Sequence, residues 1–190
     1  MDAPRLPAGT SDALLASRGA APSLARTNAE QLLTFRTRGR WYACDLLWVR
    51  EILRQPALTP VDRAPPLVRG LIHLRGQIVT ALDLDRRLGF HSAVAQGPAE
   101  RCIVFKTSPE LARLAHPPSD CELAGNDIIG VVVDQIGDIL AERGPVLPPP
   151  PDTISGLDHA CIAGVLPRPE GLITLINTGA FLSVPSGSAS

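Results

Sequence analysis

Residues 68–84 read VRGLIHLRGQIVTALDL, and the fold can be worked out from this stretch. It holds two short apolar runs, residues 71–74 and 78–82, separated by Arg75-Gly76-Gln77. This pattern predicts two β-strands joined by a tight turn, because Gly76 can adopt the positive φ that a Cβ disfavours. Both runs are apolar on both faces, so we expect the hairpin to lie in the centre of a sheet rather than at its edge.

Similar short runs recur along most of the chain. Two further strands are predicted at residues 32–36 and 41–46, joined as a hairpin by a turn at Arg38-Gly39. Others are predicted at residues 101–105, 128–133, 136–140, 161–166 and 172–176. Helical turns are predicted at residues 47–53, 85–88 and 180–182, and near Ser108. The 19 prolines and 16 glycines exclude long helices. About nine or ten short strands with little helix predict a mainly β protein, built as barrels or a sandwich.

The two ends of the chain differ from the middle. Residues 1–28 are rich in Ala, Pro, Ser, Gly and Thr and show no apolar periodicity, which is typical of a disordered N-terminal tail. Residues 184–190 read as a C-terminal tail. A single ordered domain is therefore expected over residues 29–183.

Composition excludes several classes of protein. The 18 basic and 19 acidic residues give a net charge of −1, which offers no basic field for binding nucleic acid. The longest apolar run has six residues, far short of the roughly 18 needed to span a membrane, so no membrane insertion is expected. The start of the chain lacks a signal-peptide pattern, and the four cysteines are far apart in the sequence. This usage is typical of reduced, mostly buried thiols in a cytoplasmic protein.

The sequence offers little catalytic chemistry. It contains no nucleophile elbow and no phosphate-binding loop, and its four histidines are scattered. Asp83 and Asp85 lack the further ligands of a metal site and are expected to be solvated turn or cap carboxylates. Ser155, Asp158 and His159 could form a small hydrolase site, but residues so close along a chain do not easily converge on one substrate atom. We therefore expect no catalytic residues, no metal site and no cofactor.

One pair of charged residues stands out. Arg75 lies at the tip of the apolar hairpin, and Glu51 follows Val49-Arg50 in the predicted helical turn. A guanidinium that is partly removed from water favours a carboxylate partner, which it can hold in a fixed fork geometry. Two possibilities stay open from the residues alone: Arg75 pairs with Glu51, or it points into water.

The order of these segments resembles the CheW-like coupling domain of bacterial chemotaxis. The resemblance runs from about Leu32 to Leu182. The most specific part is the spacing RG-(x)4-RG of Arg69-Gly70 and Arg75-Gly76, followed by an apolar strand and Asp83. The other matching segments are residues 33–35, 41–46, 49–52, 129–134 and 172–177.

This resemblance implies two packed five-stranded SH3-like β-barrels with a few short helical turns and a shared apolar core. It also implies a non-catalytic cytoplasmic adaptor that links methyl-accepting chemoreceptors to the histidine kinase CheA. The same adaptor role in another chemosensory array, one for pilus motility or second-messenger signalling, is the nearest alternative. Segment 107–126 looks like an insertion where the family has a short connection.

The resemblance further implies which residues meet the partners. Val49 and Glu51 match positions where receptor and kinase contacts cluster. Gly70, Arg75 and Gly76 match positions near the receptor-binding groove. The Glu51–Arg75 pair coincides with an internal ion pair expected of the family. The residue chemistry and the resemblance therefore select the same pair.

Overall fold

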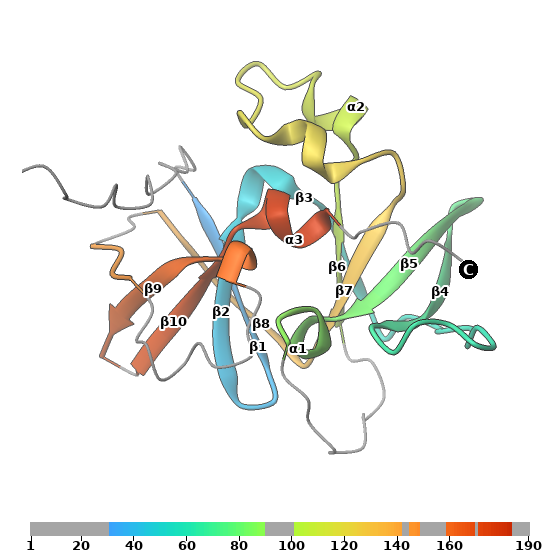
Figure 1. Ribbon diagram of the computed structural model, residues 1–190, viewed down its shortest axis with the longest axis horizontal. Helices are drawn as coiled ribbons and strands as arrows, with labels where there is room; N and C mark the ends of the chain where they lie inside the picture. The colour runs from blue at the N-terminus through green and yellow to red at the C-terminus, as the bar shows by residue number, and fades with distance from the viewer. Residues whose placement is uncertain (1–30, 90–100, 142–144, 149–158, 170, 184–190) are drawn as a thin grey trace, which may run out of the picture.

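Two five-stranded β-sheets make up most of the described part of the protein. Figure 1 shows how their strands are arranged. The computed structural model describes residues 31–89, 101–141, 145–148, 159–169 and 171–183. The first sheet has the order β8-β1-β2-β10-β9, with β1 (Leu32–Thr37), β2 (Arg40–Asp45), β8 (Gln135–Leu140), β9 (Ile162–Arg168) and β10 (Gly171–Ile176). The second has the order β3-β6-β7-β5-β4, with β3 (Val49–Arg54), β4 (Val68–Leu74), β5 (Gln77–Asp83), β6 (Arg101–Phe105) and β7 (Ile129–Val133).

The predicted mainly β fold with two five-stranded, SH3-like units is confirmed. Each unit is an open sheet rather than a ring closed by hydrogen bonds, because its strand order ends on two strands that do not pair with each other. The second sheet uses the continuous stretch from β3 to β7, whereas the first combines β1 and β2 with β8, β9 and β10. Two parallel contacts, β10 with β2 and β5 with β7, join strands far apart in the chain.

Two predictions about individual elements were wrong. Residues 47–53 form the end of a 3-10 helix, η1 (Leu46–Trp48), followed by strand β3. Residues 49–54 form a strand rather than a helical turn because their backbone pairs with the antiparallel strand β6. The β4–β5 hairpin is not wholly central either: β5 is an inner strand, but β4 ends its sheet. Among the residues that the structure describes, only the isolated Thr59–Leu71 bridge lies on the outer side of β4.

The tight turns follow from Arg-Gly dipeptides. Arg75 and Gly76 have φ values of 50° and 81°, and Arg38 and Gly39 have 46° and 79°. Positive φ at both central residues is the requirement of the two-residue hairpin turn that matches strand twist. Leu74 pairs with Gln77 across the first of these turns. The predicted hairpins at Arg38-Gly39 and Arg75-Gly76 are thus confirmed.

The largest apolar core lies between the two sheets. Leu33, Phe35 and Tyr42 of the first sheet join Ile103 and Val131 of the second in one buried cluster. Smaller clusters lie on the opposite face of each sheet, because alternate strand residues point to opposite sides. This arrangement matches the shared core that the resemblance implied.

Short helices close the ends of the strands. They are α1 (Leu84–Arg87), α2 (Ser108–Leu111), η2 (Cys121–Ala124), η4 (His159–Cys161) and α3 (Thr178–Leu182). Within the described ranges no helix is long and apolar enough to cross a membrane.

The four cysteines are free thiols: Cys44, Cys102 and Cys161 are buried, and Cys121 is partly buried. Burial raises the pKa of Cys102 to about 12. The predicted tails, residues 1–28 and 184–190, lie outside the described residues.

Gly70 is expected to be a sensitive position for stability. Its φ is 150°, and a Cβ there would lie 2.6 Å from the backbone oxygen of Thr59. Thr59 also exchanges two backbone hydrogen bonds with Leu71, of 2.8 and 2.9 Å, so it cannot easily move away. Gly70→Ala should lower the free energy of unfolding by about 2 kcal/mol in urea denaturation.

The matched control for this change is Gly76→Ala. Gly76 also has a positive φ, of 81°, but a Cβ there would meet no atom within 4 Å. It should therefore cost only the backbone strain, about 1 kcal/mol. Equal losses in the two variants would contradict the steric argument at Gly70.

Candidate partner-binding site

Glu51 and Arg75 meet at one end of the second sheet. Glu51 lies in β3 and Arg75 in the turn between β4 and β5. The Nη2 atom of Arg75 is 3.4 Å from Oε2 of Glu51. The Arg75 side chain is nevertheless 80% exposed, against 22% for Glu51. Both possibilities left open by the sequence are therefore realised: the guanidinium touches Glu51 and also faces water.

Sequence reasoning missed Arg50, which joins the same site. Its Nη2 atom donates to Oε1 of Gln77 at 2.7 Å, and its Nε atom lies 3.5 Å from Oε1 of Glu110 in α2. Glu51 is a weaker contact of Arg50, at 3.8 Å. No sequence signal could have found Glu110, because it lies 60 residues from Arg50 by their numbering in a segment read as an insertion.

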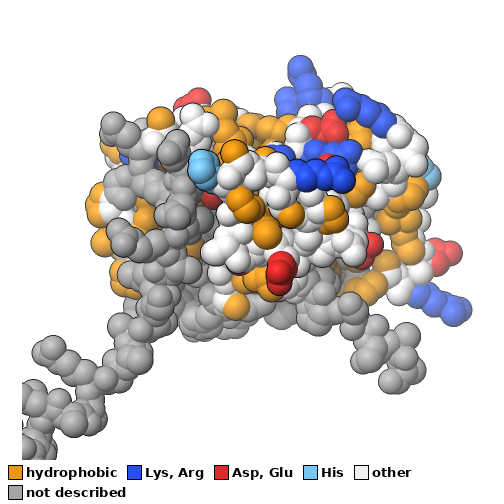
Figure 2. Space-filling view, turned by 90° about the horizontal axis from the view of Figure 1, so that it is seen from above, with side chains coloured by type: hydrophobic (Ala, Val, Ile, Leu, Met, Phe, Trp, Pro, Cys, Tyr) orange, Lys and Arg blue, Asp and Glu red, His pale blue; other side chains and the backbone are white. Residues whose placement is uncertain are grey.

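These side chains bridge the open edge of the second sheet. Strands β3 and β4 are its two end strands and do not pair through their backbones. Arg75–Glu51 and Arg50–Gln77 instead join β3 to the β4–β5 hairpin. Figure 2, seen from above the view of Figure 1, shows Lys and Arg side chains gathered on one part of the visible surface with carboxylates beside them.

The other residues implied by the resemblance have different places. Val49 begins β3 and is half-buried, and Lys106 Nζ donates to the carbonyl oxygens of Leu47 and Val49 at 2.7 Å each. Burial lowers the pKa of Lys106, while the negative charge of Glu110 raises it.

The two glycines implied by the resemblance lie at different points of the β4–β5 hairpin. Gly76 sits beside Arg75 at the hairpin tip, whereas Gly70 is buried in β4. Their roles in partner binding stay predictions.

A second charged cluster links the two sheets. Arg38, in the β1–β2 turn, contacts Oδ2 of Asp83 and Oδ2 of Asp85, each at 3.1 Å. The expectation that these carboxylates are solvated was wrong, because their side chains are only 5% and 3% exposed. Asp83 also caps α1 by accepting from the Arg86 N–H. The chain folds Arg38 onto them from the other sheet, which local sequence could not indicate.

Tyr42 completes this cluster. Its hydroxyl donates to Oδ1 of Asp85 at 3.2 Å. Burial, and then the negative charge of Asp85, raise the pKa of Tyr42. Burial also raises the pKa of Asp85, and the Arg38 guanidinium opposes that rise. The cluster therefore joins the two sheets through charges held largely out of water.

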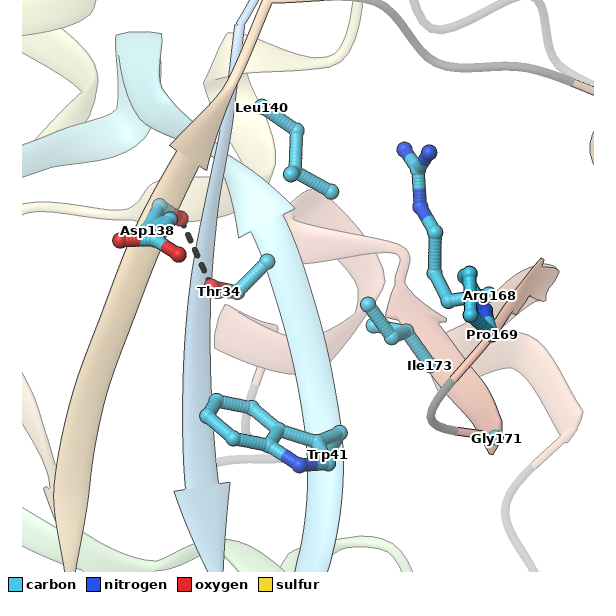
Figure 3. Close-up of a pocket in the computed structure, with 8 residues that line it drawn as sticks. All are labelled: Thr34, Trp41, Asp138, Leu140, Arg168, Pro169, Gly171 and Ile173. Carbon is cyan, nitrogen blue, oxygen red and sulfur yellow. Dashed lines mark hydrogen bonds between the residues drawn. The ribbon is translucent and has the colours of Figure 1, made fainter.

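A pocket of about 470 Å³ opens on the first sheet, away from the Glu51–Arg75 pair. Figure 3 shows Trp41, Leu140 and Ile173 around it and the Arg168 side chain reaching along its wall. The Thr34 hydroxyl donates to the backbone oxygen of Asp138 at 2.7 Å. No feature of the sequence predicted this pocket.

The described ranges contain no group of three or more His, Cys, Asp and Glu side chains placed to hold a metal ion. Of the hydrolase alternative, Ser155 and Asp158 lie outside the described residues. The backbone of His159 begins η4, and its side chain is not described.

Fold and site together define a class: a twin SH3-like β-sheet domain with an ion-pair-bridged sheet edge. A model of the CheW-like domain matches residues 31–186, most of the chain. The chain belongs to the CheW-like domain family, which confirms the resemblance seen in its sequence.

Individual proteins of this family are similar over most of their length. The probable chemotaxis protein CheW of Rhizobium etli is 25% identical over 159 residues, covering 84% of this chain and 91% of that protein. The chemotaxis protein CheW of Rhizobium meliloti is 27% identical over 146 residues, covering 77% and 83%. The crystal structure of the scaffolding protein TtCheW from Thermoanaerobacter tengcongensis has a TM-score of 0.59 at 21% identity, covers 82% of this chain and 93% of its own, and supports the fold.

Proposed function

We propose that this protein is a non-catalytic, cytoplasmic chemotaxis adaptor. It would bind the cytoplasmic tips of methyl-accepting chemoreceptors and a CheA-type histidine kinase. Its membership of the CheW-like domain family supports this role. The role is also supported by the similarity of this chain to chemotaxis proteins CheW, which align over most of its length.

The observation that carries the proposal is the unequal exposure of the Glu51–Arg75 pair. Glu51 is mostly covered and is fixed in a strand, whereas Arg75 is 80% exposed at a hairpin tip. The guanidinium has five donors and uses few of them on Glu51, so it can also bind acceptor groups of a partner. Val49 and Gly76 flank the pair in sequence and complete the proposed contact surface.

The adaptor would act through binding alone. A scaffold changes kinase output only if it contacts the active and inactive kinase states with different affinity. The adaptor would therefore hold receptor and kinase in a fixed geometry and carry out no chemical step. The rigid core shared by the two sheets supplies such a fixed frame.

The proposal is tested with the full chain and two purified probes, a soluble receptor signalling-tip hairpin and the regulatory domain of a CheA-type kinase. Surface plasmon resonance should detect binding to each, and binding to one should not exclude the other. Absence of binding to both would contradict the adaptor role. A pull-down from the native cell would then show which kinase, and so which chemosensory array, the protein serves.

A further inference from the structure

Segment 107–126 is a folded part of the domain and is attached at several points. Thr107 and Glu110 form a capping box, in which the Thr107 N–H donates to Oε2 of Glu110 at 2.9 Å. The Thr107 hydroxyl lies 3.1 Å from the same oxygen and donates to it. The Ser108 hydroxyl bonds the carbonyl oxygens of Cys121 and Glu122, which ties α2 to η2. Leu111 is fully buried in the core between the sheets. The segment thus holds Glu110 in a defined position.

Glu110 reaches the candidate partner surface through Arg50. Its Oε1 atom, which the capping box leaves free, is the atom that lies 3.5 Å from Arg50 Nε. Arg50 in turn bonds Gln77 in the hairpin and lies beside Glu51. We call Glu110, Arg50, Glu51 and Arg75 the ion-pair chain; its charges alternate in sign from α2 to the hairpin tip.

The exposed fraction of the side chains differs sharply between the last member of the ion-pair chain, Arg75, and the other three. The side chains of Glu110, Arg50 and Glu51 are 33%, 24% and 22% exposed, whereas Arg75 is 80% exposed. The three inner members are mostly covered, and Arg75 offers the largest exposed fraction to another molecule. Lys106, the residue just before the segment, also holds Val49 through its carbonyl oxygen.

We propose that segment 107–126 is a positioning element of the partner-binding surface. Glu110 fixes Arg50, Arg50 fixes the hairpin through Gln77, and Arg75 is thereby presented to the receptor tip in one orientation. This inference rests on the proposed adaptor function and adds a residue far from the expected contacts. Glu110 is a positioning residue, because it acts through Arg50 and Gln77.

The test measures binding of the full chain to the soluble receptor-tip hairpin. Glu110→Gln should weaken the affinity about fivefold. The melting temperature should change little, because ion pairs this exposed contribute little to stability. Glu122→Gln, a carboxylate of η2 in the same segment, is the matched control and should bind like the wild type. Gln77→Ala breaks the link on the hairpin side without altering α2 and should reproduce the loss.

The double variant Glu110→Gln/Arg75→Gln separates positioning from a merely structural role. If Glu110 acts through Arg75, the double variant should bind no more weakly than Arg75→Gln alone. Wild-type affinity in both Glu110→Gln and Gln77→Ala, or fully additive losses in the double variant, would overturn the inference. If the wild type and Glu122→Gln also fail to bind, the proposed function itself is wrong.

Discussion

Replacing Arg38 with methionine is expected to lower the free energy of unfolding by about 3 kcal/mol at pH 7. The change removes the guanidinium that contacts both Asp83 and Asp85 and leaves two carboxylates, 5% and 3% exposed, without that partner. Loss of one member of a buried ion pair is costly because the remaining charge stays out of water. Urea unfolding followed by tryptophan fluorescence measures the effect.

The loss in Arg38→Met should depend on pH. Burial already raises the pKa of Asp85, and Arg38 opposes that rise, so the variant should raise it further. A carboxyl whose pKa is higher in the folded than in the unfolded state binds more protons when folded. Its contribution to stability is therefore present at low pH and is lost as pH rises through the folded pKa. The difference between wild type and variant should be larger at pH 7.5 than at pH 5.

Arg63→Met is the matched control for this prediction. Arg63 is also an arginine with positive φ, of 57°, but it is exposed in the loop before β4. The two substitutions thus share the residue change and the backbone conformation, but only Arg38→Met removes a contact to the buried carboxylates Asp83 and Asp85. A loss as large at Arg63, or no pH dependence at Arg38, would argue against the buried cluster as the cause.

Arg75→Glu is expected to weaken binding to the receptor tip by about 30-fold, the effect of a binding hot spot. The new carboxylate would lie beside Glu51, and a donor group facing the partner would become an acceptor. Because the Arg75 side chain is 80% exposed, the domain should stay folded. Affinity is measured by surface plasmon resonance and folding by a thermal melt.

Arg63→Glu controls for the change in net charge. It reverses an exposed arginine in the loop that precedes β4, whereas Arg75 follows β4 at the opposite end of that strand. Unchanged affinity in Arg75→Glu, with a normal melt, would remove Arg75 from the partner surface. A large fall in melting temperature would show instead that the pair with Glu51 mainly stabilises the sheet edge.

Local sequence was sufficient for two of the hairpin turns and for the described strands other than β3. The Arg-Gly pairs at 38–39 and 75–76 predict hairpins because positive φ is a property of single residues and their neighbours. The family followed from the order of short motifs along the chain. The chemistry of a guanidinium next to apolar strands indicated Glu51 as one possible partner of Arg75 and left a water-facing Arg75 as the other, and the structure shows both features.

Residues 47–53 show where local reasoning fails. Apolar Leu47, Val49 and Ile52 have a spacing that suits a helical turn, yet most of the segment pairs with β6 as strand β3. Strand propensity depends on the partner strand, and that partner begins at Arg101, far along the chain. The first sheet likewise needs β1 and β2 to meet β8, β9 and β10.

The amino-acid sequence thus determined the class of fold, the hairpins and the family, since these depend on patterns within short stretches. Tertiary structure alone decided that Arg38 covers Asp83 and Asp85, and that Glu110 reaches Arg50. Each of these contacts joins side chains from separate elements, and their burial is set by packing rather than by neighbours in sequence. Charged side chains whose burial could not be predicted from the sequence therefore connect the two sheets and bridge the open edge of the second sheet.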